Sequence, residues 1–420
     1  MRVLFVVHKF PPQSVGGVET YTWSLARALA EAGHEAFVFY PVIGLDAAEA
    51  RSEEGGIHRW AVSLPETRGH EGALQQFWHT FRDVGLEARF QKCLAEVRPD
   101  IVHFQHVQGL SARLLALASG WHRLVTLHDY WFFCANSQLL RPDGQMCAGP
   151  QWGWNCVDCL TVRADLHWMR ALRPLVALPL AYRNAYLRRM ARSVPVFLAP
   201  SEFLRQQYVH QGFPGERITV IDLGLDMQRL AGPADSVLPE PTARPQFGFL
   251  GALAPHKGVH VLVRAFNQLP ANAALTIYGS ETTSPGYVAQ LKAMATHPHI
   301  RFAGAVDYHH VGAALRQLDC LVVPSIWYEN SPMVIQEAYG CKIPVVASRL
   351  GALPEKVRDG ETGRLFAPGD SSDLARVLRE LIEQPEQLAA LRASIKPGPT
   401  IQQHAQQMLE IYQAACSAGL

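Results

Sequence analysis

Short apolar runs alternate along the chain with stretches in which apolar residues recur at helical spacing. Arg2–Val7 is the first such run, and Glu19–Ala32 carries the helical spacing that follows it. A short apolar run suits a buried strand, whereas a 3.6-residue period suits an amphipathic helix. Gly33 then ends the helix, because glycine readily adopts the left-handed conformation found at helix C-termini. Repetition of this step predicts a mostly parallel sheet with helices on both faces.

The alternation restarts after a proline-rich stretch. Further strands are predicted at Glu35–Tyr40, Ile101–Gln105, Leu124–Leu127, Val196–Ala199, Phe247–Gly251, Leu275–Gly279, Ile300–Gly304, Leu321–Ser325 and Val345–Arg349. Further helices are predicted at Glu202–Gln211, Val259–Leu269, Met333–Gly340, Asp373–Glu383 and Ile401–Ala415. The prolines at positions 233, 239, 241 and 245 mark the interruption, which is typical of a linker.

Length and rhythm together predict an α/β protein of two domains, since 420 residues are too many for one compact core. We expect an N-terminal Rossmann-like domain over residues 1–230, a linker over 231–245 and a C-terminal Rossmann-like domain over 246–400. The last segment, 401–420, is predicted to be a helix that packs back on the N-terminal domain. Ligands of such sheets bind beyond the carboxyl ends of the strands, so the residues after each strand are the candidates for chemistry.

Composition and charge exclude several classes of protein. Hydrophobic residues make up 48% and charged residues 18% of the chain, as in a globular protein. A net charge of +1 argues against a nucleic-acid partner. The chain has no run of about 18–20 apolar residues that could span a membrane, and its first apolar run lacks a small-residue cleavage site. We therefore expect a cytoplasmic protein with reduced cysteines.

Two glutamates follow the strand Leu321–Ser325. Glu329 is expected in the loop after that strand, and Glu337 two turns along the next helix, with Pro332 in the first turn of that helix. Backbone N–H groups of residues 330–333 would bind anionic oxygens such as a phosphate without a metal. The carboxylates would accept hydrogen bonds from sugar or ribose hydroxyls. An acidic helix N-terminus with no ligand is the alternative for an isolated pair.

The residues around this pair resemble the signature of the retaining glycosyltransferases of family four. The resemblance lies in residues 325–348, SIWYENSPMVIQEAYGCKIPVVAS, and continues in residues 351–366, GALPEKVRDGETGRLF. It covers essentially the whole chain and implies the GT-B fold, in which two Rossmann-like domains with parallel sheets face each other across a cleft. It also implies that the domain over residues 1–230 binds the acceptor and that the domain over 246–400 binds the nucleotide-sugar donor. It also implies a hexosyltransferase that moves a sugar from a UDP- or GDP-sugar to a glycan or lipid-linked acceptor in bacterial polysaccharide or glycolipid biosynthesis.

The same resemblance implies roles for individual residues. Glu329 would contact the transferred sugar and Glu337 the ribose. The donor-binding positions that it implies are Gly16, Gly17, Gly251, Asn330, Ser331, Pro332, Met333 and Glu337.

A lysine after the strand Phe247–Gly251 is the candidate cation for the diphosphate. Lys257 can balance the charge of the leaving group, which is the largest electrostatic demand of the reaction. Many family members carry an arginine where this chain has Ala252. Half of the usual cationic clamp is therefore missing, and His256 or a residue from elsewhere in the fold would have to replace it.

The N-terminal half contributes two further candidates. Gly16 and Gly17 precede the helix that begins near Glu19, and would let backbone approach a phosphate or sugar closely. His128 follows another strand and can hydrogen-bond a sugar hydroxyl or position the acceptor, whereas a structural histidine is the alternative. The resemblance favours the functional role. Ser201 is expected mainly as the N-cap of the next helix.

Half of the cysteines fall within a short irregular segment, which we expect to be an insertion of the N-terminal domain over residues 134–159. Cys134, Cys147, Cys156 and Cys159 belong to this segment, out of eight cysteines in the chain. The Cys156–Cys159 spacing is that of a zinc knuckle, and four thiolates suit a tetrahedral structural zinc. Disulfides and unligated thiols are the alternatives. No cofactor is expected to take part in catalysis.

An arginine-rich segment spans residues 163–192. It holds seven arginines and one acidic residue, Asp165, interleaved with leucine, tryptophan and tyrosine. Such a segment could lie on anionic lipid at the inner face of the membrane, near a lipid-linked acceptor. The alternative is a surface helix packed on the first domain.

Individual residues and missing motifs bear on three other possible functions. Ala252 raises the alternative of a sugar-nucleotide-binding protein without turnover. An NAD-dependent oxidoreductase is disfavoured because the G-x-G-x-x-G pattern is absent. A phosphorylase would need a pyridoxal-binding lysine, and none can be assigned. Retention by double displacement requires a carboxylate nucleophile, which we cannot identify, so we expect substitution on one face with the departing diphosphate taking the acceptor proton.

Overall fold

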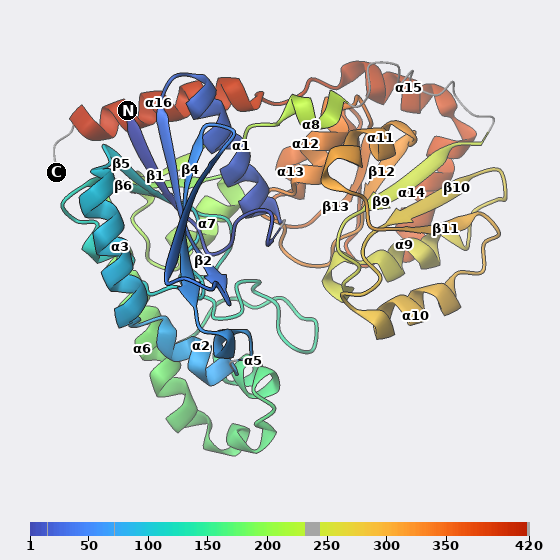
Figure 1. Ribbon diagram of the computed structural model, residues 1–420. Coiled ribbons are helices and arrows are strands. Elements are labelled where there is room, and N and C mark those ends of the chain that lie inside the picture. Colours follow the sequence, from blue (N-terminus) through green and yellow to red (C-terminus); the bar gives the residue numbers. More distant parts are fainter. Residues whose placement is uncertain (15, 71, 232–243, 418–420) are drawn as a thin grey trace. The chain divides into compact units, whose positions relative to one another are not determined.

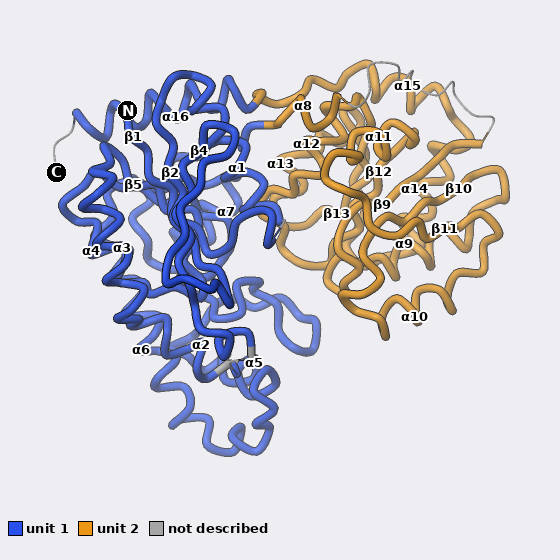
Figure 2. Tube along the Cα trace, in the orientation of Figure 1, with its two compact units in different colours: residues 1–224, 401–420 blue, residues 225–400 orange. Residues whose placement is uncertain are grey.

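Each of two units in the chain is built around its own mostly parallel sheet (Figure 1). The computed structural model describes residues 1–14, 16–70, 72–231 and 244–417. Unit 1 comprises Met1–Gly224 and Ile401–Leu420, and unit 2 comprises Leu225–Thr400 (Figure 2). Most of the expected linker, residues 232–243, lies outside the described residues.

Unit 1 has an eight-stranded sheet in the order β3-β4-β2-β1-β5-β6-β7-β8. Its strands are β1 (Arg2–Val6), β2 (Glu35–Ile43), β3 (Glu49–Glu54), β4 (Ile57–Leu64), β5 (Ile101–Phe104), β6 (His122–Thr126), β7 (Val196–Ala199) and β8 (Ile218–Val220). Its helices are α1 (Gly17–Glu31), α2 (Ala73–His79), α3 (Val84–Val97), α4 (Leu114–Leu117), α5 (Cys156–Arg163), α6 (Arg173–Arg192), α7 (Glu202–His210) and α16 (Ile401–Ser417). All pairings are parallel except that of β3 with β4.

Unit 2 has a six-stranded parallel sheet in the order β11-β10-β9-β12-β13-β14. Its strands are β9 (Gln246–Leu250), β10 (Ala274–Tyr278), β11 (Ile300–Gly304), β12 (Cys320–Val323), β13 (Val345–Ser348) and β14 (Gly363–Phe366). Its helices are α8 (Met227–Ala231), α9 (Val259–Phe266), α10 (Pro285–Met294), α11 (Val311–Arg316), α12 (Met333–Gly340), α13 (Leu353–Lys356), α14 (Ser371–Glu383) and α15 (Pro385–Ser394).

The unit 2 sheet is buried on both faces. Along β12, Cys320 and Val322 belong to the apolar core that contains α9 and α14, whereas Leu321 and Val323 belong to the core that contains α11 and α12. Alternate residues of a strand point to opposite faces, so helices cover both sides of this sheet. This arrangement explains why the central strands β12 (CLVV) and β13 (VVAS) are buried along their whole length and are almost entirely apolar.

The helix α16 packs against α1 and β6 of unit 1. Tyr21 on α1 and His404 on α16 are joined by a 2.8 Å hydrogen bond between buried side chains. Unit 1 is thus completed by a segment that follows the whole of unit 2 in the chain.

Candidate active site

Three hydrogen-bond donors converge on one carboxylate oxygen in unit 2. Glu329 Oε1 accepts from Lys257 Nζ at 2.7 Å, from Ser325 Oγ at 2.7 Å and from Trp327 Nε1 at 2.9 Å. Burial alone would raise the pKa of Glu329, but the charge of Lys257 and these hydrogen bonds outweigh it, so the pKa lies below its ordinary value. The carboxylate is therefore ionised at neutral pH and can accept further hydrogen bonds through its second oxygen.

Lys257 is held in place by a close approach of backbone. It ends the 3-10 turn Pro255–Lys257 after β9, and Gly258 follows with a φ of 69°. A Cβ at position 258 would lie 1.9 Å from the carbonyl oxygen of Pro324. Only glycine permits this contact, which brings the lysine to the carboxyl end of β12.

His256 does not supply the cation that Ala252 leaves missing. Its ring meets the edge of Trp327 with 5.0 Å between centroids. Burial, and then the charge of Lys257, lower the pKa of His256 below its ordinary value. The imidazole is therefore neutral at neutral pH. Among the residues named from the sequence, Lys257 remains the cation of this loop.

Glu337 makes an ion pair that the sequence did not indicate. Its side chain on α12 is buried and bonds to the guanidinium of Arg229 from α8. Arg229 Nε donates to the Tyr308 carbonyl at 3.2 Å, and the guanidinium lies 4.2 Å from the Tyr308 ring centroid. Burial raises the pKa of Glu337 even against the charge of Arg229. The predicted contact with a ribose stays a prediction, and Arg229 joins the candidate residues.

The segment between the two glutamates differs in one detail from the prediction. Pro332 is the N-cap of α12, so it precedes the first turn and does not form part of it. Asn330 is buried, whereas Ser331, Pro332 and Met333 are half-buried. The first backbone N–H groups of a helix lack carbonyl partners within it. The predicted binding of an anionic oxygen at this end of α12 stays a prediction.

Glycines shape the loops beside this segment. Gly351 has a φ of 61°, and a Cβ there would lie 2.9 Å from the carbonyl oxygen of Glu329. The next amide, of Ala352, donates to that oxygen at 2.9 Å. A Cβ on Gly279, after β10, would likewise meet the Gly251 carbonyl at 2.3 Å. The loop after β13 thus packs closely on the Glu329 backbone, and the loop after β10 packs on Gly251 at the carboxyl end of β9.

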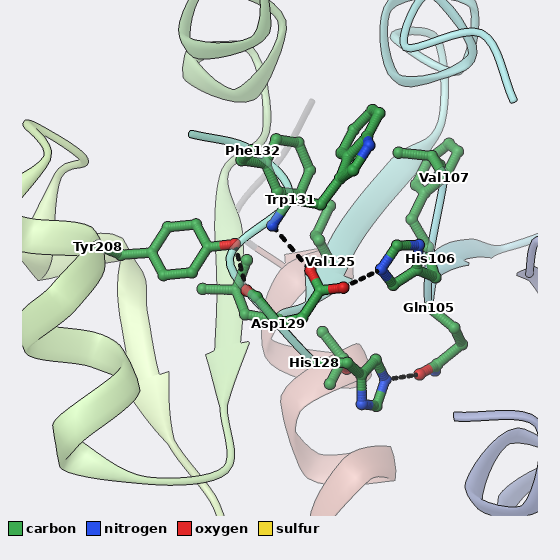
Figure 3. A pocket seen from close by; sticks show the side chains of 12 residues that line it. Gln105, His106, Val107, Val125, His128, Asp129, Trp131, Phe132 and Tyr208 are labelled. Carbon is green, nitrogen blue, oxygen red and sulfur yellow. Dashed lines mark hydrogen bonds and ion pairs between the residues drawn. The ribbon is translucent and has the colours of Figure 1, made fainter. Parts of the chain in front are cut away.

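In unit 1, His128 lies at the carboxyl end of β6 and lines a pocket with residues that follow β5 (Figure 3). Its Nε2 donates to Gln105 Oε1 at 2.9 Å. Burial, and then the neighbouring His106, lower the pKa of His128 to about 3. The ring is therefore neutral at physiological pH, and it acts there as a hydrogen-bonding group.

A chain of buried side chains supports His128. Gln105 Nε2 lies 3.1 Å from His103 Nε2, which lies 2.7 Å from Thr126 Oγ1. His103 Nδ1 lies 2.7 Å from the hydroxyl of Tyr412 on α16. Burial lowers the pKa of His103 well below its ordinary value. The histidine at the strand end is thus connected by hydrogen bonds to the last helix of the structure.

A second histidine of the pocket, His106, pairs with Asp129 (Figure 3). The backbone N–H of Gln108 donates to His106 Nδ1 at 3.0 Å, so Nε2 carries the proton. Nε2 lies 2.8 Å from Asp129 Oδ2, and the other oxygen of Asp129 accepts from the Trp131 amide at 2.8 Å. The pair places an imidazole and a carboxyl group beside His128.

Gly16 and Gly17 lie at the start of α1, and their predicted approach to a phosphate or sugar stays a prediction. Gly16 is the N-cap of α1, which begins at Gly17, two residues before the predicted start at Glu19. A Cβ on Gly16 would lie 2.6 Å from Glu19 Oε2. Glu19 also accepts from Ser14 Oγ at 3.1 Å, so an acidic side chain lies at the turn expected to face the donor. Ser201 is confirmed as a helix N-cap, since its side chain accepts from the Leu204 amide at 3.2 Å.

The four clustered cysteines line one small cavity of about 20 Å³. All four are free thiols. Within residues 1–14, 16–70, 72–231 and 244–417, no group of three or more His, Cys, Asp or Glu side chains is arranged to hold a metal ion as it stands. The predicted zinc therefore stays a prediction, and the thiols share a cavity without forming a ready-made site.

Several residues of these clusters could not be found from the sequence. His106, Gln105 and His103 belong to a strand and the loop after it, where their only signal is position at a strand end. Tyr412 is distant in sequence, and Arg229 lies on a helix next to the linker. These contacts depend on packing between segments, which periodicity does not encode.

Two protein-family models together match most of the chain. The family described as Glycosyltransferase Family 4 matches residues 15–229, and that described as Glycosyl transferases group 1 matches residues 234–396. Glycogen synthase of Mycobacterium tuberculosis H37Rv is 26% identical over 407 residues, covering 92% of this chain and 87% of that protein. D-inositol 3-phosphate glycosyltransferase of Rhodococcus opacus is 30% identical over 307 residues, covering 68% of each.

Solved structures show the same fold. Sucrose-phosphate synthase of Thermosynechococcus elongatus has a TM-score of 0.73 at 18% identity, with all of both chains covered. The Anabaena protein HepE in complex with UDP and glucose has a TM-score of 0.64 at 21% identity, again with all of both chains covered. The predicted fold class, two Rossmann-like domains with parallel sheets, is confirmed.

Proposed function

The chain belongs to glycosyltransferase family 4, and from that premise we propose that it transfers a hexose from a nucleoside diphosphate donor, with retention, to a glycan or lipid-linked acceptor. The observation that carries the proposal is the ionised, buried Glu329 held by Lys257, Ser325 and Trp327. A carboxylate fixed in this way can orient sugar hydroxyls, and the lysine beside it can meet a diphosphate.

Lys257 would take the largest electrostatic load of the reaction. In the free protein its ammonium is balanced by Glu329 at 2.7 Å. When a donor binds, the diphosphate would share that ammonium, and the N–H groups at the start of α12 would bind the remaining phosphate oxygens. Glu329 would then be free to accept hydrogen bonds from the transferred sugar.

The substitution itself would occur on one face of the sugar. The bond from the anomeric carbon to the diphosphate oxygen breaks, and a bond from that carbon to the acceptor oxygen forms. The acceptor proton passes to the departing diphosphate oxygen. Three donors already stabilise the charge on Glu329 Oε1, which makes this oxygen a weak nucleophile and disfavours a covalent intermediate.

In unit 1, His128 would position the sugar or the acceptor. The ring is neutral at physiological pH, and Nε2 is committed to Gln105 at 2.9 Å. A histidine in this state orients a hydroxyl by hydrogen bonding and does not serve as a proton donor. The alternative of a sugar-nucleotide-binding protein without turnover is favoured by one observation: neither Ala252 nor the neutral His256 completes the cationic clamp.

The names of two relatives support the proposed acceptor class. One of them is a glycogen synthase, and another is a phosphatidyl-myo-inositol mannosyltransferase of Mycobacterium leprae. Their names state a polysaccharide and an inositol lipid, so either kind of acceptor fits the proposal. Within the described residues, no helix has the length and apolar character needed to cross a bilayer.

The test uses purified protein and a panel of UDP-, GDP- and ADP-sugars. We expect the wild type to release nucleotide from one donor, and Glu329→Gln to lower that rate by about 100-fold or more, because it removes the charge and keeps the shape. Glu386→Gln, at an exposed glutamate of α15, is the matched control. Inverted product stereochemistry would overturn retention. Binding of a nucleotide sugar without turnover, even with acceptor, would favour the non-catalytic alternative.

A further inference from the structure

The helix α6 presents an apolar stripe to solvent. One face of the helix is buried and includes Val176 and Leu180. On the opposite face, Leu175, Leu178 and Tyr182 are 65%, 66% and 64% exposed. Spacings of three and four residues place these side chains in one row along the helix. A surface helix normally turns its polar face outward, so this orientation calls for a partner.

Aromatic rings extend the stripe toward α2. The Tyr182 ring stacks on Phe81 with 5.5 Å between centroids and a 25° interplanar angle. Phe81 in turn lies 6.0 Å from the ring of Trp78, which is 65% exposed. In Figure 1, α2, α5 and α6 lie together at one end of unit 1. The apolar surface therefore continues from one helix to the next.

A loop adds a further indole on the other side of the stripe. Trp152 is 88% exposed and has a φ of 57°, a conformation that bulky residues rarely adopt. The loop is anchored at Gly153, where a Cβ would lie 2.3 Å from the carbonyl oxygen of Ala177 on α6. Trp152, Tyr182 and Arg188 line one shallow hollow. Packing thus holds Trp152 outward beside α6.

Arginines surround this surface, although not all seven of the segment take part. Arg183 is 2% exposed, and Arg173 donates to Asp158 at 2.6 Å. The exposed arginines of residues 163–192 are Arg163, Arg170, Arg189 and Arg192. Of these, Arg170 lies 3.5 Å from the Asp158 carboxylate. Only Asp165 opposes them within that segment. The local charge is therefore positive, even though the whole chain carries only +1.

We propose that the surface formed by Leu175, Leu178, Tyr182, Trp152 and Trp168, which we call the α6 face, docks on an anionic lipid bilayer. Trp168 is 66% exposed on the 3-10 turn His167–Leu172 that precedes α6. Leucines would enter the acyl boundary, tryptophan and tyrosine would lie at the headgroup level, and the arginines would meet lipid phosphates.

We assign a bilayer to the α6 face because apolar side chains and exposed arginines lie together there. A second copy of this chain would bring the same arginines to the interface, and like charges would then repel. Anionic lipid supplies both an apolar layer and negative charge within about 10 Å of each other, which matches leucines flanked by arginines. The inference does not depend on sugar transfer, and either can fail alone.

Vesicle co-sedimentation of the full chain tests the proposal. We expect the wild type to sediment with vesicles of phosphatidylcholine and phosphatidylglycerol, and much less with phosphatidylcholine alone. The variant Leu175→Ser/Leu178→Ser/Tyr182→Ser should lower binding by about tenfold, since three inserted side chains are lost. The control Val84→Ser/Val209→Ser/Val220→Ser, at exposed valines of unit 1, should bind like the wild type.

Three results would overturn the inference. They are a wild type that stays in the supernatant with both vesicles, a triple variant that binds unchanged, and equal binding to neutral and anionic vesicles. Light scattering that finds a dimer, converted to a monomer by the triple variant, would assign the α6 face to a second copy. Circular dichroism of both variants verifies that lost binding does not reflect lost folding.

Discussion

Gln105 and His128 are joined by a 2.9 Å hydrogen bond across the carboxyl ends of two neighbouring strands. Because Gln105 also contacts His103, the orientation of His128 depends on side chains that reach back to α16. A histidine named from its place after a strand thus proves to be the outermost member of a buried network. The network fixes which nitrogen of His128 carries its proton.

Gln105 is therefore predicted to be a positioning residue. Gln105→Leu removes the acceptor for His128 Nε2 and should lower turnover by about tenfold or more, as is typical when a supporting partner is lost. Gln105→Glu places a carboxylate there and should raise the pKa of His128 above about 3. Histidine resonances followed by NMR between pH 3 and 8 report this shift. An unchanged pKa in Gln105→Glu would contradict the assigned contact.

Unit 1 is predicted to lose stability in acid. Burial lowers the pKa of His8 to about 2, of His128 to about 3 and of His404 to about 4. Below about pH 6.5 these histidines bind protons in the unfolded chain but stay neutral in the folded chain. Their contribution to the free energy of unfolding is therefore fully present above that pH and is lost as the pH decreases. Each histidine contributes a slope of about 1.4 kcal/mol per pH unit.

Urea unfolding between pH 7.5 and 4.5, followed by fluorescence, measures this slope. Removing one group by His404→Gln should reduce the slope by about 1.4 kcal/mol per pH unit. His310→Gln, at a histidine whose side chain is 73% exposed, controls for the loss of any histidine. A free energy of unfolding that does not change between pH 6.5 and 4.5 would show that these rings are not held neutral.

Gly258 and Gly360 form a matched pair for testing the loop that carries Lys257. Both have a positive φ, of 69° and 77°. A Cβ at position 258 would lie 1.9 Å from the carbonyl oxygen of Pro324, whereas a Cβ at position 360 would have no heavy atom of another residue within 4 Å. Gly360→Ala should cost about 1 kcal/mol from backbone strain alone. Gly258→Ala should cost more than about 3 kcal/mol, because backbone must also move.

The test compares the denaturant midpoints of the two glycine variants and measures nucleotide binding by each. Displacement of the loop would also separate Lys257 from Glu329, so Gly258→Ala should weaken binding while Gly360→Ala does not. Equal losses of stability would refute the close approach to Pro324.

The four clustered thiols are predicted to bind one structural zinc. Burial raises the pKa of the Cys134 thiol, although the nearby amides of Asn136, Gln138 and Leu139 act to lower it, and the buried Arg183 lies near enough to interact with Cys134 and Cys156. Amide donors and a nearby cation would stabilise thiolates. Elemental analysis of protein purified without chelator should find about one zinc per chain, since four thiolates form one tetrahedral site.

Cysteine variants distinguish this zinc from adventitious metal. Cys156→Ser/Cys159→Ser should abolish the bound zinc, and Cys320→Ser, at a buried cysteine of unit 2, should retain it. Protein that holds no zinc before any chelator is added would reject the site.

The sequence predicted regular elements better than contacts. Ile300–Gly304 and Met333–Gly340 have the predicted bounds, because each is an apolar segment flanked by clear turn or capping residues. The strand β3 was missed, since its polar sequence EARSEE lies at an antiparallel edge and carries no apolar period. The motif around Glu329 indicated its place after β12, but not that Lys257, Ser325 and Trp327 share one oxygen.

The position of α16 has a consequence for synthesis on the ribosome. Unit 2 can complete its fold as soon as Thr400 has emerged, whereas unit 1 cannot be completed until α16, which follows unit 2 in the chain, has been synthesised. Until then Tyr21 and His103 lack His404 and Tyr412, their buried partners. The half of the protein that is translated first is thus completed last, and a nascent chain would expose an unfinished first unit to chaperones throughout translation of the second.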